Sequence, residues 1–298
     1  MSWRSVIISN PAKLSHKDKH LVIKQNEEAC IPLEDISVIV VETQQASITS
    51  SLLDQLARKT IPLIVCGPSH LPTGLFLSFQ QHSRFLKVLK SQMEQTLPFR
   101  KNCWQMVVKK KIENQAKCLE LLGKKYCNEL INISKQVKSG DPDNRESAAA
   151  SVYFDSYMPS ISRQEDNTVN AALNYGYSIM RGVVARSLAA YGFLPAVGIH
   201  HRSELNAFNL ADDFMEVLRP LVDLWVGQNI EIDKEFCINK REGLVSLLSK
   251  DILIDGARQR VIRAIDIMIS SYKTAATTRD PKYLKLPDLL PIIEHDWE

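Results

Sequence analysis

The segment from Gly198 to Pro220, GIHHRSELNAFNLADDFMEVLRP, places two histidines and four acidic residues in a stretch that otherwise has the pattern of a buried helix. Carboxylates are rare on such helices because burying them costs free energy. From Leu210 onward apolar residues recur at helical spacing, while Asn209, Asp213 and Glu216 form a second stripe at i, i+4 and i+7. Asp213 and Glu216 are therefore predicted to point the same way. Carboxylates together with an imidazole are a ligand set suited to Mg²⁺ or Mn²⁺.

His201 precedes Glu216 by fifteen residues, a separation of about 22 Å on one continuous helix. The two side chains could share an ion only if the helix begins after His201, and the polar run at 202–204 is compatible with a loop there. An alternative stays open. His201 could be a capping or surface histidine, with Asp212, Asp213 and Glu216 on a solvated helix face.

A third candidate ligand lies near the start of another helix. The sequence GDPDN at 140–144 is a turn signal, and Asn144 or Asp143 could cap the helix that begins RESAAASVYF. Glu146 then falls in the first turn, where the helix dipole favours the ionised carboxylate that a metal needs. It could equally be no more than part of a good helix N-terminus.

The order of these segments is informative. A glutamate opens a helix before three alanines, then AALNYGYSIMRGVVARSLAAYGFLPAVGIHH follows, and then LADDFMEVLRP. Together they resemble the CRISPR spacer-acquisition integrases, the larger and catalytic of the two core CRISPR adaptation proteins, and most closely the branch beside the single-effector type II systems. The N-terminal quarter and the segment KKKIENQ fit the same family. The resemblance implies a small N-terminal β domain and a larger helical catalytic domain.

The resemblance also implies a reaction and its residues. The reaction is metal-dependent insertion of short duplex spacers into the CRISPR array, by attack of a 3′-hydroxyl on the repeat phosphodiester, with nuclease activity when water attacks instead. Glu146, His201 and Glu216 match the family's catalytic metal-ligand positions, Asp213 matches an auxiliary acidic position, and the ion is Mg²⁺ or Mn²⁺. His200 is left for a hydrogen bond to DNA or to a carboxylate behind the ligands. The alternative is a DNA-binding scaffold of the same fold with a structural acidic cluster.

The partners implied are double-stranded DNA, as prespacer and CRISPR repeat, a second copy of the chain, a small ferredoxin-like CRISPR adaptation subunit, and other CRISPR proteins of the same locus. Insertion of a duplex needs two joinings on opposite strands, so we expect a homodimer with two active sites. The tail from Asp280 to Glu298, with Trp297 near its end, could contact the small subunit or pack on its own domain.

The net charge is only +3, so the distribution of charge is more informative than its total. Three basic clusters are candidates for DNA binding, and each could instead be a solvated helix surface. The candidate residues are Arg84, Lys109, Lys110, Lys111, Arg258, Arg260 and Arg263.

The pattern of the chain predicts an α+β protein with two domains, a β-rich one at 1–82 and an all-α one at 83–298. The resemblance implies that the first is a dimerisation domain and the second the catalytic domain. β-branched runs predict strands in the first eighty residues, and from Gln80 onward the period is helical. The predicted strands are Ser5–Ser9, Leu21–Lys24, Ile36–Val41, Ile61–Cys66 and, as an edge, Thr73–Leu77, with a helix at Ser47–Arg58. No phosphate-binding glycine loop follows any of them.

Composition excludes several classes. There is no run of eighteen apolar residues and no signal peptide, so we expect a cytoplasmic protein without a membrane partner. The six cysteines lack Cys-x-x-Cys spacing and are predicted to be reduced core thiols, not zinc ligands or disulfides.

Overall fold

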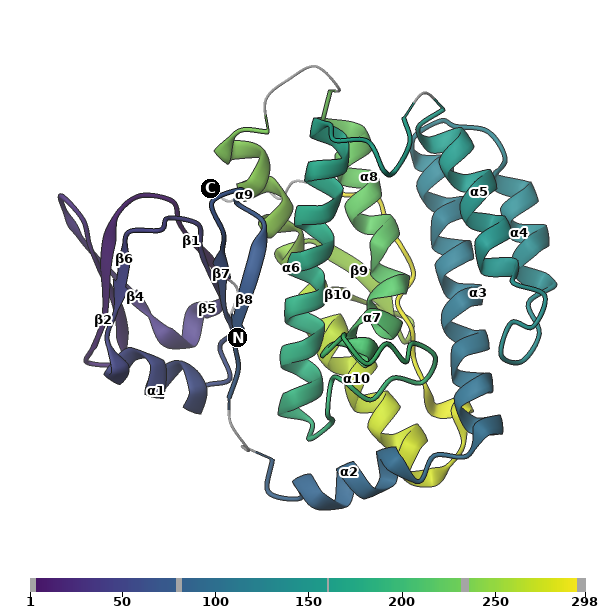
Figure 1. The fold of residues 1–298 in the computed structure, drawn as a ribbon, viewed down its shortest axis with the longest axis horizontal. Helices are drawn as coiled ribbons and strands as arrows, with labels where there is room; N and C mark the ends of the chain where they lie inside the picture. The colour runs from purple at the N-terminus through teal and green to yellow at the C-terminus, as the bar shows by residue number, and fades with distance from the viewer. Residues whose placement is uncertain (1–3, 79–81, 160, 232–235, 294–298) are drawn as a thin grey trace.

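The computed structural model describes residues 4–78, 82–159, 161–231 and 236–293. A strand-rich part, formed by about the first eighty residues, lies beside a larger and mainly helical part (Figure 1). The fold is therefore α+β, as predicted.

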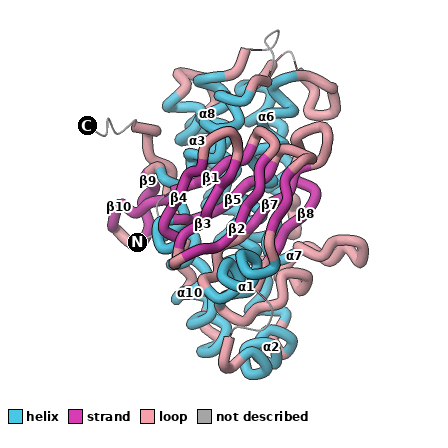
Figure 2. The backbone as a smooth tube through the Cα atoms, turned by 90° about the vertical axis from the view of Figure 1, so that its left-hand side faces the viewer, coloured by secondary structure: helices cyan, strands magenta, loops and turns pink. Residues whose placement is uncertain are grey.

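Two four-stranded sheets make up the N-terminal part, with strand orders β1-β5-β7-β8 and β4-β3-β2-β6 (Figure 2). In the first sheet β1, β5 and β7 are parallel, and β8 closes the edge as an antiparallel strand, where an edge strand was predicted. The strands are β1 (Arg4–Ile8), β2 (Ala12–Lys17), β3 (His20–Lys24), β4 (Glu28–Pro32), β5 (Ile36–Val41), β6 (Ala46–Ile48), β7 (Leu63–Cys66) and β8 (Pro72–Phe76). The strands β2, β4 and β6 were not predicted.

A 3₁₀ turn, η1 (Leu33–Asp35), precedes β5, and helix α1 (Ser50–Arg58) follows β6. The predicted helix starts three residues too early, because Ala46–Ile48 pairs with β2 as a strand. The Thr49 side chain ends that strand and caps the helix by accepting a hydrogen bond from the Leu52 N–H.

Strand β5 is buried along its whole length, which explains its uninterrupted ISVIVV sequence. Ile36, Ile39 and Val41 belong to the core of the N-terminal part, whereas Val38 and Val40 belong to the core of the helical part. The first sheet is thus covered on both faces, and the two parts share one of its strands. β8 ends at Phe76 and α2 begins at Phe85, and the proposed division at 82 and 83 lies between these elements.

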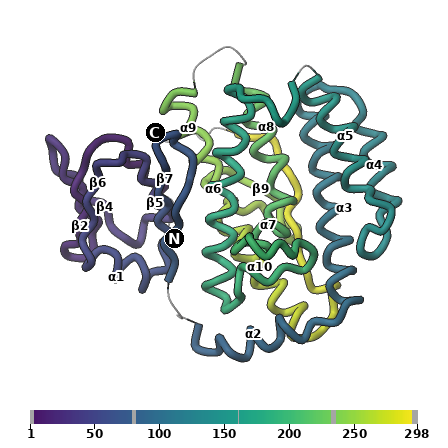
Figure 3. Tube along the Cα trace, in the orientation of Figure 1, coloured from purple at the N-terminus to yellow at the C-terminus, as the bar shows by residue number. Residues whose placement is uncertain are grey.

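The larger part consists mainly of helices around the long α3 and α6 (Figure 3). Its α-helices are α2 (Phe85–Met93), α3 (Leu97–Leu121), α4 (Cys127–Lys135), α5 (Arg145–Tyr157), α6 (Thr168–Ala190), α7 (Asn209–Met215), α8 (Arg219–Asn229), α9 (Ile238–Ser246) and α10 (Val261–Thr278). Its 3₁₀ turns are η2 (Glu216–Leu218), η3 (Leu247–Ser249) and η4 (Pro281–Tyr283).

The prediction that this part is all-α is wrong in one place. An antiparallel hairpin, β9 (Asp251–Ile254) and β10 (Ala257–Arg260), precedes α10. Asp255 and Gly256 form its turn with φ of 53° and 75°, the left-handed conformation of a tight hairpin turn. Ile252 and Ile254 of β9 are buried against the helices.

All six cysteines are free thiols. Cys66, Cys103 and Cys118 are buried, as predicted for core thiols, but Cys30 and Cys237 are exposed. Within the described ranges, no helix is both long and apolar enough to cross a bilayer.

Candidate active site

Acidic side chains from two separate segments meet at Lys111, in the middle of α3. Lys111 Nζ lies 2.6 Å from Glu146 Oε1 and 2.5 Å from Glu216 Oε2. Glu146 is in the first turn of α5, and Glu216 begins η2 directly after α7. The side chain of Glu216 is 6% exposed and that of Glu146 is 23% exposed, so the cluster opens toward solvent on the Glu146 side. Two of the three predicted catalytic residues are thus brought together, around a lysine that was predicted to bind DNA.

Lys111 and Glu216 favour each other's charged form. Burial alone would lower the pKa of Lys111, but the attraction of Glu216 and Glu146 outweighs it and raises the pKa. Burial alone would raise the pKa of Glu216, but Lys111 and Arg219 outweigh it and lower the pKa to about 2. Arg219 Nε donates to Glu216 Oε1 at 2.8 Å, whereas the buried Oε2 has the ion pair with Lys111 but no hydrogen-bond partner.

Asp141 fixes the start of α5 and with it the position of Glu146. Its Oδ1 accepts from the Arg145 N–H at 2.8 Å and its Oδ2 accepts from the Glu146 N–H at 2.9 Å. The predicted cap, Asn144 or Asp143, is wrong: Asn144 is left-handed, with φ of 49°, and its side chain makes no cap hydrogen bond. The predicted turn at 140–144 therefore does contain the capping carboxylate, but it is Asp141, three residues before Asn144.

His201 is held by Asp213. His201 Nδ1 lies 2.7 Å from Asp213 Oδ1. Because a carboxylate oxygen accepts, Nδ1–H is the donor in this contact, and Nε2 is the ring nitrogen left for another partner. The pKa of His201 is raised, chiefly by this hydrogen bond and partly by the nearby charges of Glu216 and Glu146. The helix does begin after His201, at Asn209, as the ligand hypothesis required.

The segment that carries both histidines is built around the fully buried Asp213. Its carboxylate also accepts the backbone N–H groups of Ile199, His200 and His201 at 2.7 to 3.1 Å. Gly198 makes this close approach possible, because a Cβ there would lie 2.4 Å from the His201 carbonyl oxygen and 2.8 Å from Asp213 Oδ2.

Asn209 secures the same segment, since its side chain amide donates to the carbonyls of Ala196, Ser203 and Asn206. The predicted stripe of Asn209, Asp213 and Glu216 is buried, so the alternative in which Asp213 and Glu216 lie on a solvated helix face is wrong.

The His200 ring lies edge-on to the His201 ring, with centroids 5.4 Å apart, but its main contact is different. Its ring stacks on the buried Trp104 of α3, with centroids 4.0 Å apart and planes 4° apart. Burial of this ring lowers the pKa of His200. The stack keeps a neutral imidazole at the edge of the site.

The donor set suits a divalent metal, but the side chains do not form a cage in this structure. In the described part of the chain, no group of three or more His, Cys, Asp and Glu side chains is arranged to hold a metal ion. The ammonium of Lys111 lies between the two glutamates. The buried Glu216 Oε2 without a hydrogen-bond partner and the free Nε2 of His201 are nevertheless the donors that Mg²⁺ or Mn²⁺ requires.

The three lysines at 109–111 do not form one basic surface. Lys110 pairs with Glu113 at 2.9 Å and with Asp288, and Lys111 is inside the site. Lys109 lines a shallow groove of its own with Lys135 and Arg145.

Arg258, Arg260 and Arg263 are gathered by the β9–β10 hairpin and the first turn of α10. They line a groove of about 980 Å³ that also contains Arg186 and Asp266, whose side chains form an ion pair at 3.1 Å. Asp251 lies in the same groove, so its lining has both signs of charge.

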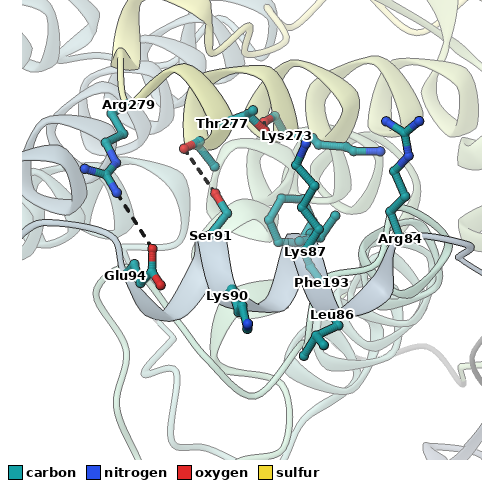
Figure 4. A pocket seen from close by; sticks show the side chains of 12 residues that line it. Arg84, Leu86, Lys87, Lys90, Ser91, Glu94, Phe193, Lys273, Thr277 and Arg279 are labelled. Atoms are coloured by element: carbon teal, nitrogen blue, oxygen red, sulfur yellow. Dashed lines mark hydrogen bonds and ion pairs between the residues drawn. The ribbon is translucent and has the colours of Figure 1, made fainter.

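Arg84 lies in a different groove, of about 640 Å³, between α2 and α10 (Figure 4). Cations line it from both helices, and Glu94 is the acidic residue of its lining, paired with Arg279 at 3.7 Å. Its cations are Arg84, Lys87, Lys90, Lys273 and Arg279. Gln92 of α2 in turn bonds the carbonyls of Leu194 and Val197, which connects this groove to the segment that leads to the histidines.

The C-terminal tail packs on its own helical part as far as it is described. Asp288 pairs with Leu253 of β9, and the Asn114 side chain bonds the backbone of Pro287 and Leu289. Trp297 lies outside the described residues.

Two residues at the site, Arg219 and Asp223, were not predicted from the sequence. Arg219 follows Glu216 by three residues, a helical spacing that could have identified it. The second is a buried carboxylate, Asp223, which accepts from the hydroxyls of Tyr153 and Tyr177, while the Arg219 guanidinium lies 4.5 Å from the Tyr177 ring centroid.

The family described as CRISPR associated protein Cas1 matches residues 6–263. The CRISPR-associated endonuclease Cas1 of Neisseria meningitidis serogroup C (strain 8013) is 42% identical over 304 aligned residues, which cover 100% of both chains.

Two solved structures have the same fold. A casposase bound to integration product has a TM-score of 0.75 at 16% identity, covering 93% of this chain and 91% of that one. A chain of a Cas6-RT-Cas1–Cas2 complex has a TM-score of 0.73 at 18% identity, covering 94% of this chain and 36% of that one. The family match and the full-length relative together show that the chain belongs to the CRISPR-associated Cas1 family.

Proposed function

We propose that this protein is a metal-dependent DNA integrase and endonuclease of CRISPR adaptation, which inserts short duplex spacers into the CRISPR array. Its full-length relative is named an endonuclease, and a structural neighbour is a casposase bound to an integration product. The observation that carries the proposal is the convergence of Glu146 and Glu216 on one cation beside His201. The nucleophile is the 3′-hydroxyl of an incoming DNA end, so the protein needs no nucleophilic side chain of its own.

Glu146, His201 and Glu216 would hold Mg²⁺ or Mn²⁺, which when bound polarises the scissile phosphate. The surrounding residues prepare these ligands. Arg219 helps to keep Glu216 ionised, and Asp213 orients His201 with Nε2 free. His200 is stacked on Trp104 beside the ligands, and the polar edge of its neutral ring would hydrogen-bond the DNA strand.

The experiment that tests this function is joining of a labelled duplex to a repeat-containing plasmid with Mn²⁺. Glu146→Gln, Glu216→Gln and His201→Ala should each lower the joining rate by about a hundredfold or more, because the three ligands act as one unit. Glu113→Gln is the control, since Glu113 pairs with Lys110 on the same helix outside the site. A Glu146→Gln protein that joins DNA at the wild-type rate contradicts the proposed site.

The alternative function is a DNA-binding scaffold with a structural acidic cluster. The same assay separates the two, because a scaffold would bind DNA without joining it. The meeting of Glu146 and Glu216 at one buried lysine favours the enzyme, as does the ring nitrogen of His201 that Asp213 leaves unused, since a purely structural cluster has no need for it.

DNA binding is assigned in this proposal to the α2–α10 groove that contains Arg84. Its five cations face one acidic residue, whereas the Arg258–Arg263 groove is partly neutralised by Asp251 and Asp266.

Lys87→Gln and Lys90→Gln should weaken duplex binding equally across sequences, and each should reduce the slope of log affinity against log salt by about one. Arg258→Gln is the matched control in the other groove. Unchanged affinity in the two lysine variants, with a loss in Arg258→Gln, would reverse the assignment.

The proposed partners are double-stranded DNA, a second copy of the chain, and a small ferredoxin-like adaptation subunit. Other proteins of the same CRISPR locus are also proposed partners. The neighbour from the Cas6-RT-Cas1–Cas2 complex supports an assembly of this kind.

A further inference from the structure

Lys111 is in an unusual position for a lysine, because it is buried between two carboxylates that the proposed function assigns to a metal. The residue is 8% exposed, and its ammonium contacts Glu146 and Glu216 at 2.6 Å and 2.5 Å. These carboxylates come from different segments, α5 and η2, and α3 packs against both. A single ammonium therefore bridges the glutamate of α5 and the glutamate of η2.

The charges around Lys111 balance without any metal. Glu146 and Glu216 contribute two negative charges, and Lys111 and Arg219 contribute two positive ones. Arg219 binds Glu216 Oε1 from the other side, and the charge on Oε2 is paired with Lys111. Without Lys111 the two carboxylates would repel each other in a site of low dielectric constant, where charges interact strongly.

The ammonium and a divalent metal cannot occupy this point together. Mg²⁺ binds carboxylate oxygens at about 2.1 Å, so an ion held by both glutamates would lie where Nζ lies now. Two cations at that distance would repel each other strongly. Lysine suits an exchange of this kind, because its charge is on a flexible four-carbon stem that can withdraw without moving the helix.

We propose that Lys111 is the resident counter-cation of the Glu146–Glu216 pair, and that a divalent metal binds by displacing its ammonium. This inference rests on the proposed function, since it requires that the pair binds a metal. It assigns to Lys111 a role in positioning the ligands before metal arrives.

The neighbouring Lys110 provides a matched control. It also pairs with two carboxylates, Glu113 and Asp288, but both are substantially exposed, at 41% and 47%, and neither belongs to the site. Lys110→Met thus removes the same charge from the same helix, one residue away, without changing the acidic pair.

The experiment measures Mn²⁺ binding by electron paramagnetic resonance of the free ion, and the melting temperature in EDTA and in Mn²⁺. Lys111→Met should bind Mn²⁺ about tenfold more tightly or better, because no cation has to be displaced. It should melt below the wild type in EDTA, and Mn²⁺ should raise its melting temperature by more than it raises that of the wild type. Lys110→Met should match the wild-type affinity. Lys111→Arg, which keeps the charge and grips carboxylates bidentately, should bind Mn²⁺ more weakly and tests the inference should Lys111→Met not fold.

The possible failures are distinguishable. Wild-type binding of Mn²⁺ that Lys111→Met weakens or leaves unchanged overturns the inference and leaves the proposed metal site intact. Equal affinities of Lys111→Arg and the wild type overturn it in the same way. Failure of every form to bind Mn²⁺, Lys111→Met included, overturns the metal-dependent function and the inference with it.

Discussion

At the scale of single residues, one buried carboxylate determines the conformation of the segment that carries both histidines. Asp213 is fully buried and accepts three backbone N–H groups besides the His201 ring. Both of its oxygens are occupied by these contacts, Oδ1 by the backbone and ring of His201 and Oδ2 by the N–H groups of Ile199 and His200. Asp213 is therefore not a spare metal ligand in this structure. It orients His201, which we propose as a metal ligand, and closes the turn after Gly198.

A second buried carboxylate, Asp223, should make stability depend on pH. Burial raises the pKa of Asp223 to about 6, from an ordinary value of 3.8, despite the hydrogen bonds from Tyr177 and Tyr153. Between these pH values the folded protein binds one proton more than the unfolded chain, so this residue lowers stability as pH rises from about 4 to 6. Its contribution amounts to about 3 kcal/mol, at about 1.4 kcal/mol for each pH unit.

Asp223→Asn should remove this dependence. Chemical unfolding at several pH values should show the wild type losing stability relative to the variant between pH 4 and pH 6, with the difference constant above about pH 7. Two curves that stay parallel throughout the range would show that Asp223 is ionised even in acid.

The site was predictable from sequence where its residues are close along the chain. Helical spacing placed Asp213 and Glu216 on one stripe, which the structure shows to be buried, and the start of the helix after His201 followed from the requirement that His201 and Glu216 share an ion. Lys111 was interpreted as surface because a KKK run carries no sign of which member turns inward. The inward orientation of Lys111 depends on where α5 and η2 pack on α3, and the local sequence does not show this packing.

At the scale of elements, α6 shows how glycines allow close packing of helices. At Gly176 a Cβ would lie 2.5 Å from Val222 Cγ1 of α8 and 3.1 Å from Leu244 Cδ2 of α9. At Gly182 of the same helix, the nearest atom is the end of the flexible Ile64 side chain, at 3.1 Å. Both positions are helical, so alanine gains the same helix propensity at each, about 1 kcal/mol.

Gly176→Ala should therefore destabilise the protein by about 1 to 3 kcal/mol, because the overlap with α8 exceeds the gain in propensity. Gly182→Ala should change stability by less than about 1 kcal/mol, since the Ile64 side chain can adjust. Thermal or urea unfolding of the two variants measures both values. Equal stability of the pair would mean that α6 and α8 separate easily at Gly176.

Element prediction failed where local signals compete with the surrounding pattern. The hairpin at 251–260 has alternating buried residues, Ile252 and Ile254, and an Asp-Gly pair that is typical of a two-residue hairpin turn. It was overlooked because the flanking sequence has helical periodicity. Strand β4 was missed because it is an exposed edge, where no apolar alternation is required.

At the scale of the whole molecule, a buried ionic cluster joins the N-terminal sheet to the helical part. Glu42, which directly follows β5 and is 2% exposed, accepts from Arg241 Nε of α9 and from the Tyr175 hydroxyl of α6, both at 2.9 Å. With β5 shared by two cores, this cluster fixes the sheet relative to the active site. A surface on the sheet can therefore set the separation of two active sites in an assembly.

The last prediction concerns that assembly. Duplex insertion requires two strand joinings, so we expect a homodimer in which paired N-terminal sheets hold two active sites apart. Strand β4 is the outer strand best suited to pairing, because residues 28–30 are exposed and it is longer than β6 at the opposite edge.

Light scattering of the isolated protein at micromolar concentration should give the mass of a dimer. Ala29→Lys on β4 should give a folded monomer with an unchanged circular dichroism spectrum, because an exposed edge lysine opposes strand pairing without affecting the fold. Ser47→Lys, exposed on β6 of the same sheet, is the matched control and should remain dimeric. A monomeric wild type contradicts the two-site geometry, whereas a dimeric Ala29→Lys protein places the interface on another surface.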